Sequence, residues 1–74
     1  MKEKVEDILQ RVIGNEEFYD SDDFLSDGLL DSLGVVAIVG MLENEFSISI
    51  KGSDVVADAF VNTDSICDLV SKYI

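Results

Sequence analysis

Asp27-Gly28-Leu29-Leu30-Asp31-Ser32-Leu33 closes a polar segment of the chain, and an apolar run from Gly34 to Leu42 follows it directly. Aspartate and serine are favoured at helix N-termini because their side-chain oxygens accept hydrogen bonds from the first backbone N–H groups. We therefore expect a helix to begin at Ser32, with the serine hydroxyl on its first turn. Unpaired N–H groups and the helix dipole favour an anion at that point, so a phosphate esterified to Ser32 would be stabilised there.

The segment over residues 32–46 is predicted to be a helix because its apolar residues recur at helical spacing. This stripe consists of Val35, Ile38, Val39, Leu42 and Phe46. A strand is the competing interpretation, since valine and isoleucine are mediocre helix formers and Gly34 and Gly40 each cost up to about 1 kcal/mol. The segment is long for a strand, and tertiary packing usually overrides weak propensity, so we favour the helix.

Two further main helices are predicted, over residues 2–13 and 64–73, because each segment carries its own apolar stripe. The stripes comprise Val5, Ile8, Leu9, Val12 and Ile13 in the first segment, and Ile66, Leu69, Val70, Tyr73 and Ile74 in the second. Gly14 is expected to end the first helix, and Thr63 is expected to cap the last one.

The connecting segments show weaker patterns. Residues 14–31 are acidic and without a sustained period, which predicts a long loop. Its apolar anchors are expected to be Phe24 and either Leu29 or Leu30. A short helix is predicted over residues 54–58, after a glycine, serine and aspartate that suit a helix start.

These elements predict an all-α fold, a four-helix bundle with three main helices, one short helix and a long first loop. A chain of 74 residues suffices for one small domain over 1–74, with no large enclosed active site. A hydrophobic content of 47% is too high for a disordered chain. We expect no membrane insertion and no signal peptide. A single cysteine cannot form an internal disulfide, which indicates a reducing cytoplasm, and we expect a monomer.

The charge balance is strongly acidic. Five basic residues against sixteen acidic ones give a formal net charge of −11. Nucleic acid and anionic membrane surfaces are poor partners for such a protein, because phosphates attract lysine and arginine. Proteins with basic docking patches are better partners, since complementary charge speeds encounter. The alternative is that the acidic residues only keep a small protein in solution.

Side chains suited to catalysis are scarce. Histidine is absent, which excludes Ser-His and Cys-His nucleophiles, and one cysteine without histidine makes a zinc site unexpected. Cys67 has Asp64 and Asp68 nearby in sequence, and neighbouring carboxylates make a thiol less reactive. A calcium-binding loop starting at Asp20 would lack a required oxygen ligand and its glycine. We therefore expect no metal site and no enzymatic activity, and any chemistry needs a group attached from elsewhere.

The triplet Asp31-Ser32-Leu33 resembles the attachment signature of the acyl carrier proteins, which include peptidyl and D-alanyl carriers. The similarity extends over nearly the whole chain. It includes Ile13-Gly14, the acidic loop with Phe24, Glu43–Phe46 with Ile48 and Ile50, Asp58-Ala59-Phe60 and Thr63–Ile66. The sequence Gly28-Leu29-Leu30-Asp31-Ser32 resembles that of D-alanyl and specialised stand-alone carriers more closely than that of the usual fatty-acid carrier. The resemblance implies a four-helix carrier that is not itself an enzyme.

The same resemblance implies a role for each residue of the triplet. Ser32 would bear 4′-phosphopantetheine, attached through a phosphodiester by a phosphopantetheinyl transferase that uses coenzyme A. Asp31 would help that transferase position magnesium and coenzyme A, and Leu33 would contact partner enzymes. The thiol of the arm would hold an acyl or aminoacyl intermediate as a thioester for fatty acid, polyketide, peptide or D-alanyl transfer. The implied partners are a loading ligase and acyl-transferring or condensing enzymes.

The predicted helix departs from fatty-acid carriers in its polarity. Gly34 and Ala37 stand where fatty-acid carriers often have acidic residues. Val36 and Gly40 lie off the main stripe and would leave an apolar exposed face, which commonly marks an interface. The residues expected to bind partners are Leu33, Val36, Ala37, Gly40 and Glu43. The alternative for Val36 is that it packs beneath the long loop.

Two other functions remain open from the residues. The first is an unmodified acidic interaction module that docks basic partners, in which Ser32 is only a helix cap worth about 1 kcal/mol. The second is an acidic ion-binding domain. Transfer of phosphopantetheine to Ser32 would separate the carrier from both.

Overall fold

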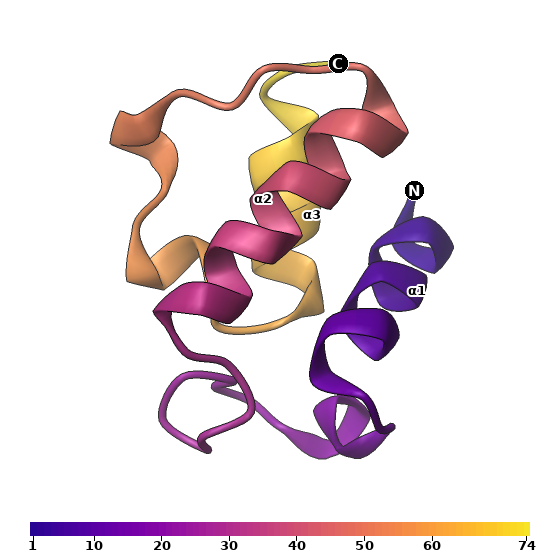
Figure 1. Ribbon diagram of the computed structural model, residues 1–74, viewed down its shortest axis with the longest axis vertical. Helices are drawn as coiled ribbons and strands as arrows, with labels where there is room; N and C mark the ends of the chain where they lie inside the picture. The colour runs from indigo at the N-terminus through magenta and orange to yellow at the C-terminus, as the bar shows by residue number, and fades with distance from the viewer.

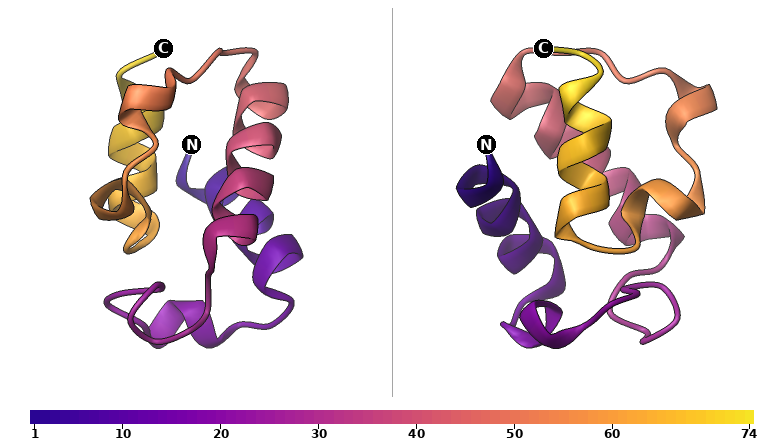
Figure 2. Two further views of the ribbon diagram at one scale, coloured as in Figure 1. Left: turned by 60° about the vertical axis from the view of Figure 1, so that its left-hand side comes forward. Right: turned by 180° about the vertical axis from the view of Figure 1, so that it is seen from behind.

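The computed structural model describes all 74 residues and is helical without strands, which confirms the predicted all-α class. Three α-helices form the bundle in Figure 1: α1 at Lys2–Ile13, α2 at Ser32–Phe46 and α3 at Thr63–Ser71. Three short 3₁₀ helices lie in the connections: η1 at Glu17–Asp20, η2 at Gly52–Asp54 and η3 at Ala57–Phe60. α1 packs against both α2 and α3, as the right-hand view of Figure 2 shows from behind.

The core between these helices is one cluster of thirteen buried residues, all of them apolar. They are Val5, Ile8, Leu9, Phe18, Phe24, Leu30, Ile38, Leu42, Ile50, Phe60, Ile66, Leu69 and Val70. Each large side chain of this kind contributes roughly 1.5–3 kcal/mol when fully buried, so the cluster is what stabilises the bundle. No helix in the structure has the length and apolar character that crossing a membrane requires.

The long connection between α1 and α2 is pinned to the core by aromatic rings. Gly14 ends α1 in the left-handed conformation, with φ of 85°. Phe18 in η1 is buried, and its ring meets that of Phe24 edge-on with 6.3 Å between centroids. The predicted anchors Phe24 and Leu30 are confirmed as buried, whereas Leu29 is half-buried. η1 was not expected from the sequence, because a turn of four residues is too short to show a period.

The predicted short helix over residues 54–58 is wrong. In its place η2 and η3 flank Val55 and Val56, and Val56 is extended with φ of −122° and ψ of 155°. Both turns close with bonds from residue i to residue i−3, such as Val55 N–H to the Gly52 carbonyl at 3.1 Å. The extended backbone of Val56 lies between the two turns, so they do not merge into one helix.

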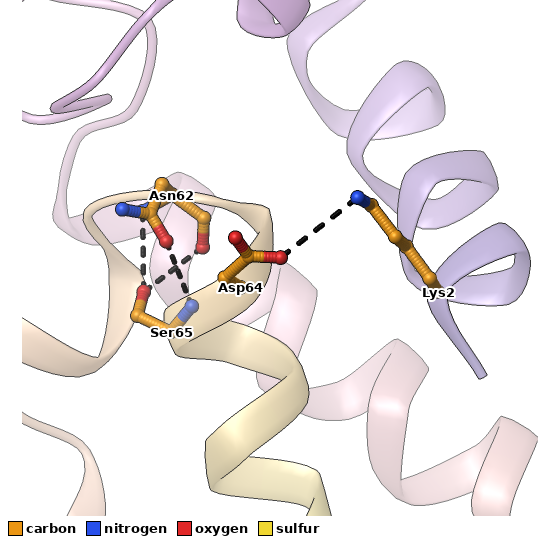
Figure 3. A network of polar contacts seen from close by, with 4 residues as sticks. All are labelled: Lys2, Asn62, Asp64 and Ser65. Atoms are coloured by element: carbon orange, nitrogen blue, oxygen red, sulfur yellow. Dashed lines mark hydrogen bonds and ion pairs between the residues drawn. The ribbon is translucent and has the colours of Figure 1, made fainter.

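The start of α3 also differs from the prediction, because Asn62 and not Thr63 is the N-cap. The Asn62 side chain accepts a hydrogen bond from Ser65 N–H at 2.7 Å, and Ser65 Oγ accepts one from Asn62 N–H at 3.1 Å (Figure 3). This reciprocal capping box leaves Thr63 as the first helical residue. Lys2 Nζ lies 3.9 Å from Asp64 in the same region, but both side chains are exposed and the pair adds little stability.

The predicted helix over residues 64–73 extends too far, because α3 ends at Ser71. Lys72 N–H bonds to the Leu69 carbonyl at 3.2 Å and Tyr73 N–H to the Val70 carbonyl at 2.9 Å. These are the tighter i to i−3 bonds of a final turn. They rotate the Tyr73 side chain off the α-helical path, towards the segment that follows α2.

Candidate functional site

The start of α2 is defined by Asp31, whose backbone is extended and whose side chain caps the helix. Its carboxylate accepts a hydrogen bond from Gly34 N–H at 2.8 Å, and its carbonyl accepts one from Val35 N–H at 3.0 Å. Ser32 is therefore the first residue of the helix, and it is exposed. Its hydroxyl has no hydrogen-bond partner in the protein, so it is free to react with a group brought from outside.

Two backbone donors beside this hydroxyl are also free. The N–H groups of Ser32 and Leu33 precede the first intrahelical bond of α2 and donate to no acceptor in the protein. The positive end of the helix dipole lies at the same place, and no acidic residue occupies the first turn. A phosphate on the Ser32 oxygen would therefore meet free hydrogen-bond donors and the positive end of the helix dipole. The capping carboxylate of Asp31 would oppose its negative charge.

The connection that leads into Ser32 is held in place by backbone hydrogen bonds to one residue. The Phe24 carbonyl accepts from Leu29 N–H at 2.9 Å and from Leu30 N–H at 3.1 Å. Phe24 N–H in turn donates to the Val61 carbonyl at 2.8 Å, which ties the loop to the segment before α3. Gly28 makes the tight return possible, because its φ of 76° is unfavourable for other residues. The approach to Ser32 is thus fixed by the backbone and the buried Phe24 ring.

Gly34 allows this loop to pack closely against α2. A Cβ atom at position 34 would lie 3.0 Å from Leu30 Cδ2 and 3.7 Å from Val12 Cγ1 of α1. Leu30 is only 5% exposed, so its methyl group has little room to withdraw. A side chain at this position would force Leu30 of the loop to shift away from the first turn of the helix, whereas the distance to Val12 is an ordinary van der Waals contact.

The outward face of α2 is uncharged over its first ten residues. Leu33 and Val36 are 79% and 67% exposed, and Ala37 and Gly40 are also exposed. The alternative that Val36 packs beneath the long loop is therefore wrong. Glu43 differs from the others in that it is half-buried, and its carboxylate accepts a hydrogen bond from Ile50 N–H at 2.8 Å. This carboxylate holds the segment after α2 in place.

An apolar pocket of about 350 Å³ lies beside Ser32, between α2 and the segment that contains η2 and η3. It is lined by Leu25, Ser32, Val35, Val36, Val55, Val56, Ala57 and Phe60. Sequence reasoning did not find this pocket, because its two walls are some twenty residues apart in the chain. The available signal was the pair Val55 and Val56, which are apolar residues in a segment with no helical stripe to explain them.

Comparison with known proteins identifies the family of this chain. The family model described as "Phosphopantetheine attachment site" matches residues 3–70. The chain belongs to this family. The D-alanyl carrier protein of Lactococcus lactis subsp. lactis (strain IL1403) is 39% identical over 56 residues, which cover 73% of this chain and 71% of the relative. The D-alanyl carrier protein of Lactococcus lactis subsp. cremoris (strain MG1363) is 38% identical with the same coverage.

Membership of the phosphopantetheine attachment site family makes this chain a carrier that bears 4′-phosphopantetheine. The exposed hydroxyl at the first turn of α2 and the two free N–H groups fit the phosphate of that group. An apolar pocket lies beside the same hydroxyl. Carrier proteins of this family are generally non-catalytic, and the match does not favour an unmodified interaction module.

Other side chains of a carrier with this structure are less suited to chemistry. Cys67 is half-buried on α3, and burial and then the negative charge of Asp64 raise the pKa of its thiol. The thiolate fraction at neutral pH is correspondingly small. The acidic residues do not form a group of three or more that could hold a metal ion.

Proposed function

We propose that Ser32 is the residue that bears the 4′-phosphopantetheine arm. The observation that carries this proposal is an exposed, unpartnered serine hydroxyl at the first position of α2, directly after the capping Asp31. The bound arm supplies a mobile thiol that holds acyl cargo as a thioester, whereas the chain's own thiol, Cys67, is half-buried on α3. The 74 residues then act as one carrier domain that positions Ser32 and presents it to partner enzymes.

Attachment requires a phosphopantetheinyl transferase with coenzyme A and magnesium. The Ser32 oxygen forms the new bond to phosphorus, the pyrophosphate linkage of coenzyme A breaks, adenosine 3′,5′-bisphosphate leaves, and the hydroxyl proton passes to the transferase. Asp31 has a second carboxylate oxygen that is not used by the cap, and it supports a role in positioning the magnesium ion. The Ser32 and Leu33 N–H groups stabilise the phosphate once it is attached.

The cargo that we favour is a D-alanyl group, because the similar Lactococcus lactis proteins are D-alanyl carriers. An adenylating ligase would then load the thiol with the amino acid, and an acyl-transferring enzyme would remove it. The second candidate is an acyl chain of a fatty acid or polyketide pathway, which the apolar pocket beside Ser32 favours. A charged ammonium group gains nothing from an apolar pocket, whereas a hydrocarbon chain does.

The docking face for these enzymes is the uncharged side of α2, formed by Leu33, Val36, Ala37 and Gly40. Apolar residues exposed next to the attachment point support contact with an apolar patch on each partner, surrounded by basic groups that match the charge of −11. Glu43 lies at the far edge of this face, and its bond to Ile50 makes it a weaker candidate for contact. The carrier is proposed to be a monomer and to be cytoplasmic, and its single cysteine fits the reducing conditions of that compartment.

The attachment is tested by incubating the purified chain with coenzyme A, magnesium and a transferase of broad specificity, followed by intact-mass measurement. The expected result is a gain of one phosphopantetheine. Ser32→Ala should gain none, and the matched control Ser49→Ala, at another exposed serine outside the site, should gain one. A mass gain in Ser32→Ala, or none in the native chain with several transferases, would refute the assignment.

The cargo is tested on the modified chain with a D-alanine-activating ligase and, separately, with an acyl-activating enzyme. D-alanyl thioester formation with the first and not the second supports the favoured cargo. The reverse result supports the acyl chain. Loading by both would show that the loading enzymes and not the carrier decide the cargo.

A further inference from the structure

The outer wall of the apolar pocket beside Ser32 is attached to the rest of the molecule at few points. This wall is the segment over residues 51–58, which contains η2 and the two valines of the pocket. No side chain between Lys51 and Ala59 is buried, although the half-buried Val55 packs against the core and the buried Ile50 and Phe60 flank the segment. Figure 1 shows this segment arching outwards at the left of the molecule, and the left-hand view of Figure 2 shows it opposite α2.

A single hydroxyl makes all the hydrogen bonds between this wall and other parts of the chain. Tyr73 Oη accepts a hydrogen bond from Lys51 N–H at 3.1 Å and donates one to the Asp54 carboxylate. The remaining bonds of the wall are local, such as Asp54 N–H to the Lys51 carbonyl at 2.9 Å. The Tyr73 ring packs against the core, so the hydroxyl is held by a fixed support.

The geometry of η2 transmits this attachment to the pocket. Two i to i−3 bonds, from Asp54 N–H and from Val55 N–H, make residues 51–55 one rigid turn. Val55 and Val56 follow directly and face Val35 and Val36 of α2 across the pocket. Movement of the turn away from Tyr73 would therefore move both valines away from α2.

We propose that the Tyr73 hydroxyl is a latch that holds Val55 and Val56 against the pocket beside Ser32, and so controls access to that pocket. With both hydrogen bonds of the Tyr73 hydroxyl made, the wall is closed and the pocket has the width seen in the structure. Without them, only the exposed and half-buried side chains of the wall itself hold it between its buried neighbours Ile50 and Phe60, and local opening of such a segment requires little free energy. Tyr73 is thus a positioning residue that acts through the wall and touches neither Ser32 nor its arm.

The hydroxyl is suited to this task at neutral pH. The bond to the Asp54 carboxylate raises the pKa of Tyr73, so the hydroxyl keeps the proton that it donates. The latch needs no arm on Ser32 to operate. Its significance for cargo rests on the proposed function, because access to the pocket then determines how far the cargo is shielded from water.

The latch is tested on the unmodified chain by the rate at which a thiol inside the pocket is labelled. The reference protein carries Cys67→Ser and Val35→Cys, which leaves one thiol on the α2 wall, and a neutral maleimide is the reagent. Adding Tyr73→Phe keeps the packed ring and removes the hydroxyl, and labelling is expected to become about tenfold faster. The matched control Tyr19→Phe removes an exposed hydroxyl that makes no hydrogen bond, and it should leave the rate unchanged.

Amide hydrogen exchange on the native chain and on Tyr73→Phe gives a second readout that does not depend on the introduced thiol. Faster exchange at Asp54 and Val55, whose acceptors are local, is expected if the whole turn opens. Faster exchange at Lys51 alone, with equal labelling rates, would overturn the proposal, because that amide loses its acceptor in any case. Since neither measurement uses the arm, failure of the latch and failure of Ser32 modification are independent results.

Discussion

Replacement of Gly40 by alanine is expected to stabilise the protein. Gly40 lies within α2 on its exposed face, and a Cβ atom at this position would meet nothing within 4 Å. Alanine is favoured over glycine inside a helix by up to about 1 kcal/mol, and no steric term opposes that gain here. For a domain of this size, 1 kcal/mol corresponds to an increase of about 4–8 °C in Tm.

Gly34→Ala is the matched variant on the same helix, and it should not show this gain. The added methyl group would lie 3.0 Å from Leu30 Cδ2, so a nearly buried side chain has to shift. Position 34 also lies in the first turn, next to the capping carboxylate of Asp31 at 3.5 Å, where helix propensity matters less. We expect Gly34→Ala to be neutral or destabilising, which places it about 1 kcal/mol or more below Gly40→Ala.

Both variants are compared with the native chain by thermal and urea unfolding, followed by far-ultraviolet circular dichroism, which reports the helix content. Equal stabilisation by the two substitutions would show that α1, Leu30 and α2 do not pack as closely as described. No stabilisation by Gly40→Ala would contradict the open environment at that position. A stabilised Gly40→Ala that is modified normally but loaded more slowly by its partner enzyme would link this glycine to docking.

Three further predictions concern the cap, the charge and the thiol. Asp31→Ala should lower stability by about 1 kcal/mol through loss of the N-cap, measured by unfolding. Asp31→Asn should keep the cap but slow mass gain with the transferase, and an unchanged rate would exclude the carboxylate from positioning magnesium. Added salt should raise Tm, because it screens repulsion within a chain of net charge −11, and a midpoint indifferent to ionic strength would contradict this. Cys67 should react with iodoacetamide more slowly than a free thiol at neutral pH and faster as pH rises, since its raised pKa keeps it protonated. Asp64→Asn should speed that reaction, as followed by mass spectrometry.

Periodic patterns made the three main helices predictable from sequence. Val5, Ile8 and Leu9 repeat at the spacing of one helix face, and all three are buried, because a helix that covers a core has to repeat in this way. The same reasoning located the start of α2, since the Asp31 side chain can bond only to N–H groups a few residues ahead. These features depend on neighbours along the chain.

Features that depend on distant residues were not predictable in the same way. Asn62 and Thr63 are both suitable caps, and Ser65 decides between them by completing a reciprocal pair of bonds with Asn62. The turns at η2 and η3 are too short to show a period. The pocket beside Ser32 requires knowledge of which segment lies opposite α2, and the end of α3 depends on the engagement of Tyr73 by residues twenty positions earlier.

The backbone hydrogen bonds made by Phe24 have a consequence for how such carriers diversify. Ser32 is held from behind, by the bonds of Phe24 to Leu29, Leu30 and Val61. The side chains on the outward face of α2 take no part in holding it. Substitutions on this proposed docking face can therefore change which partner is bound without displacing Ser32, the proposed attachment point, so one scaffold can enter new pathways by surface changes alone.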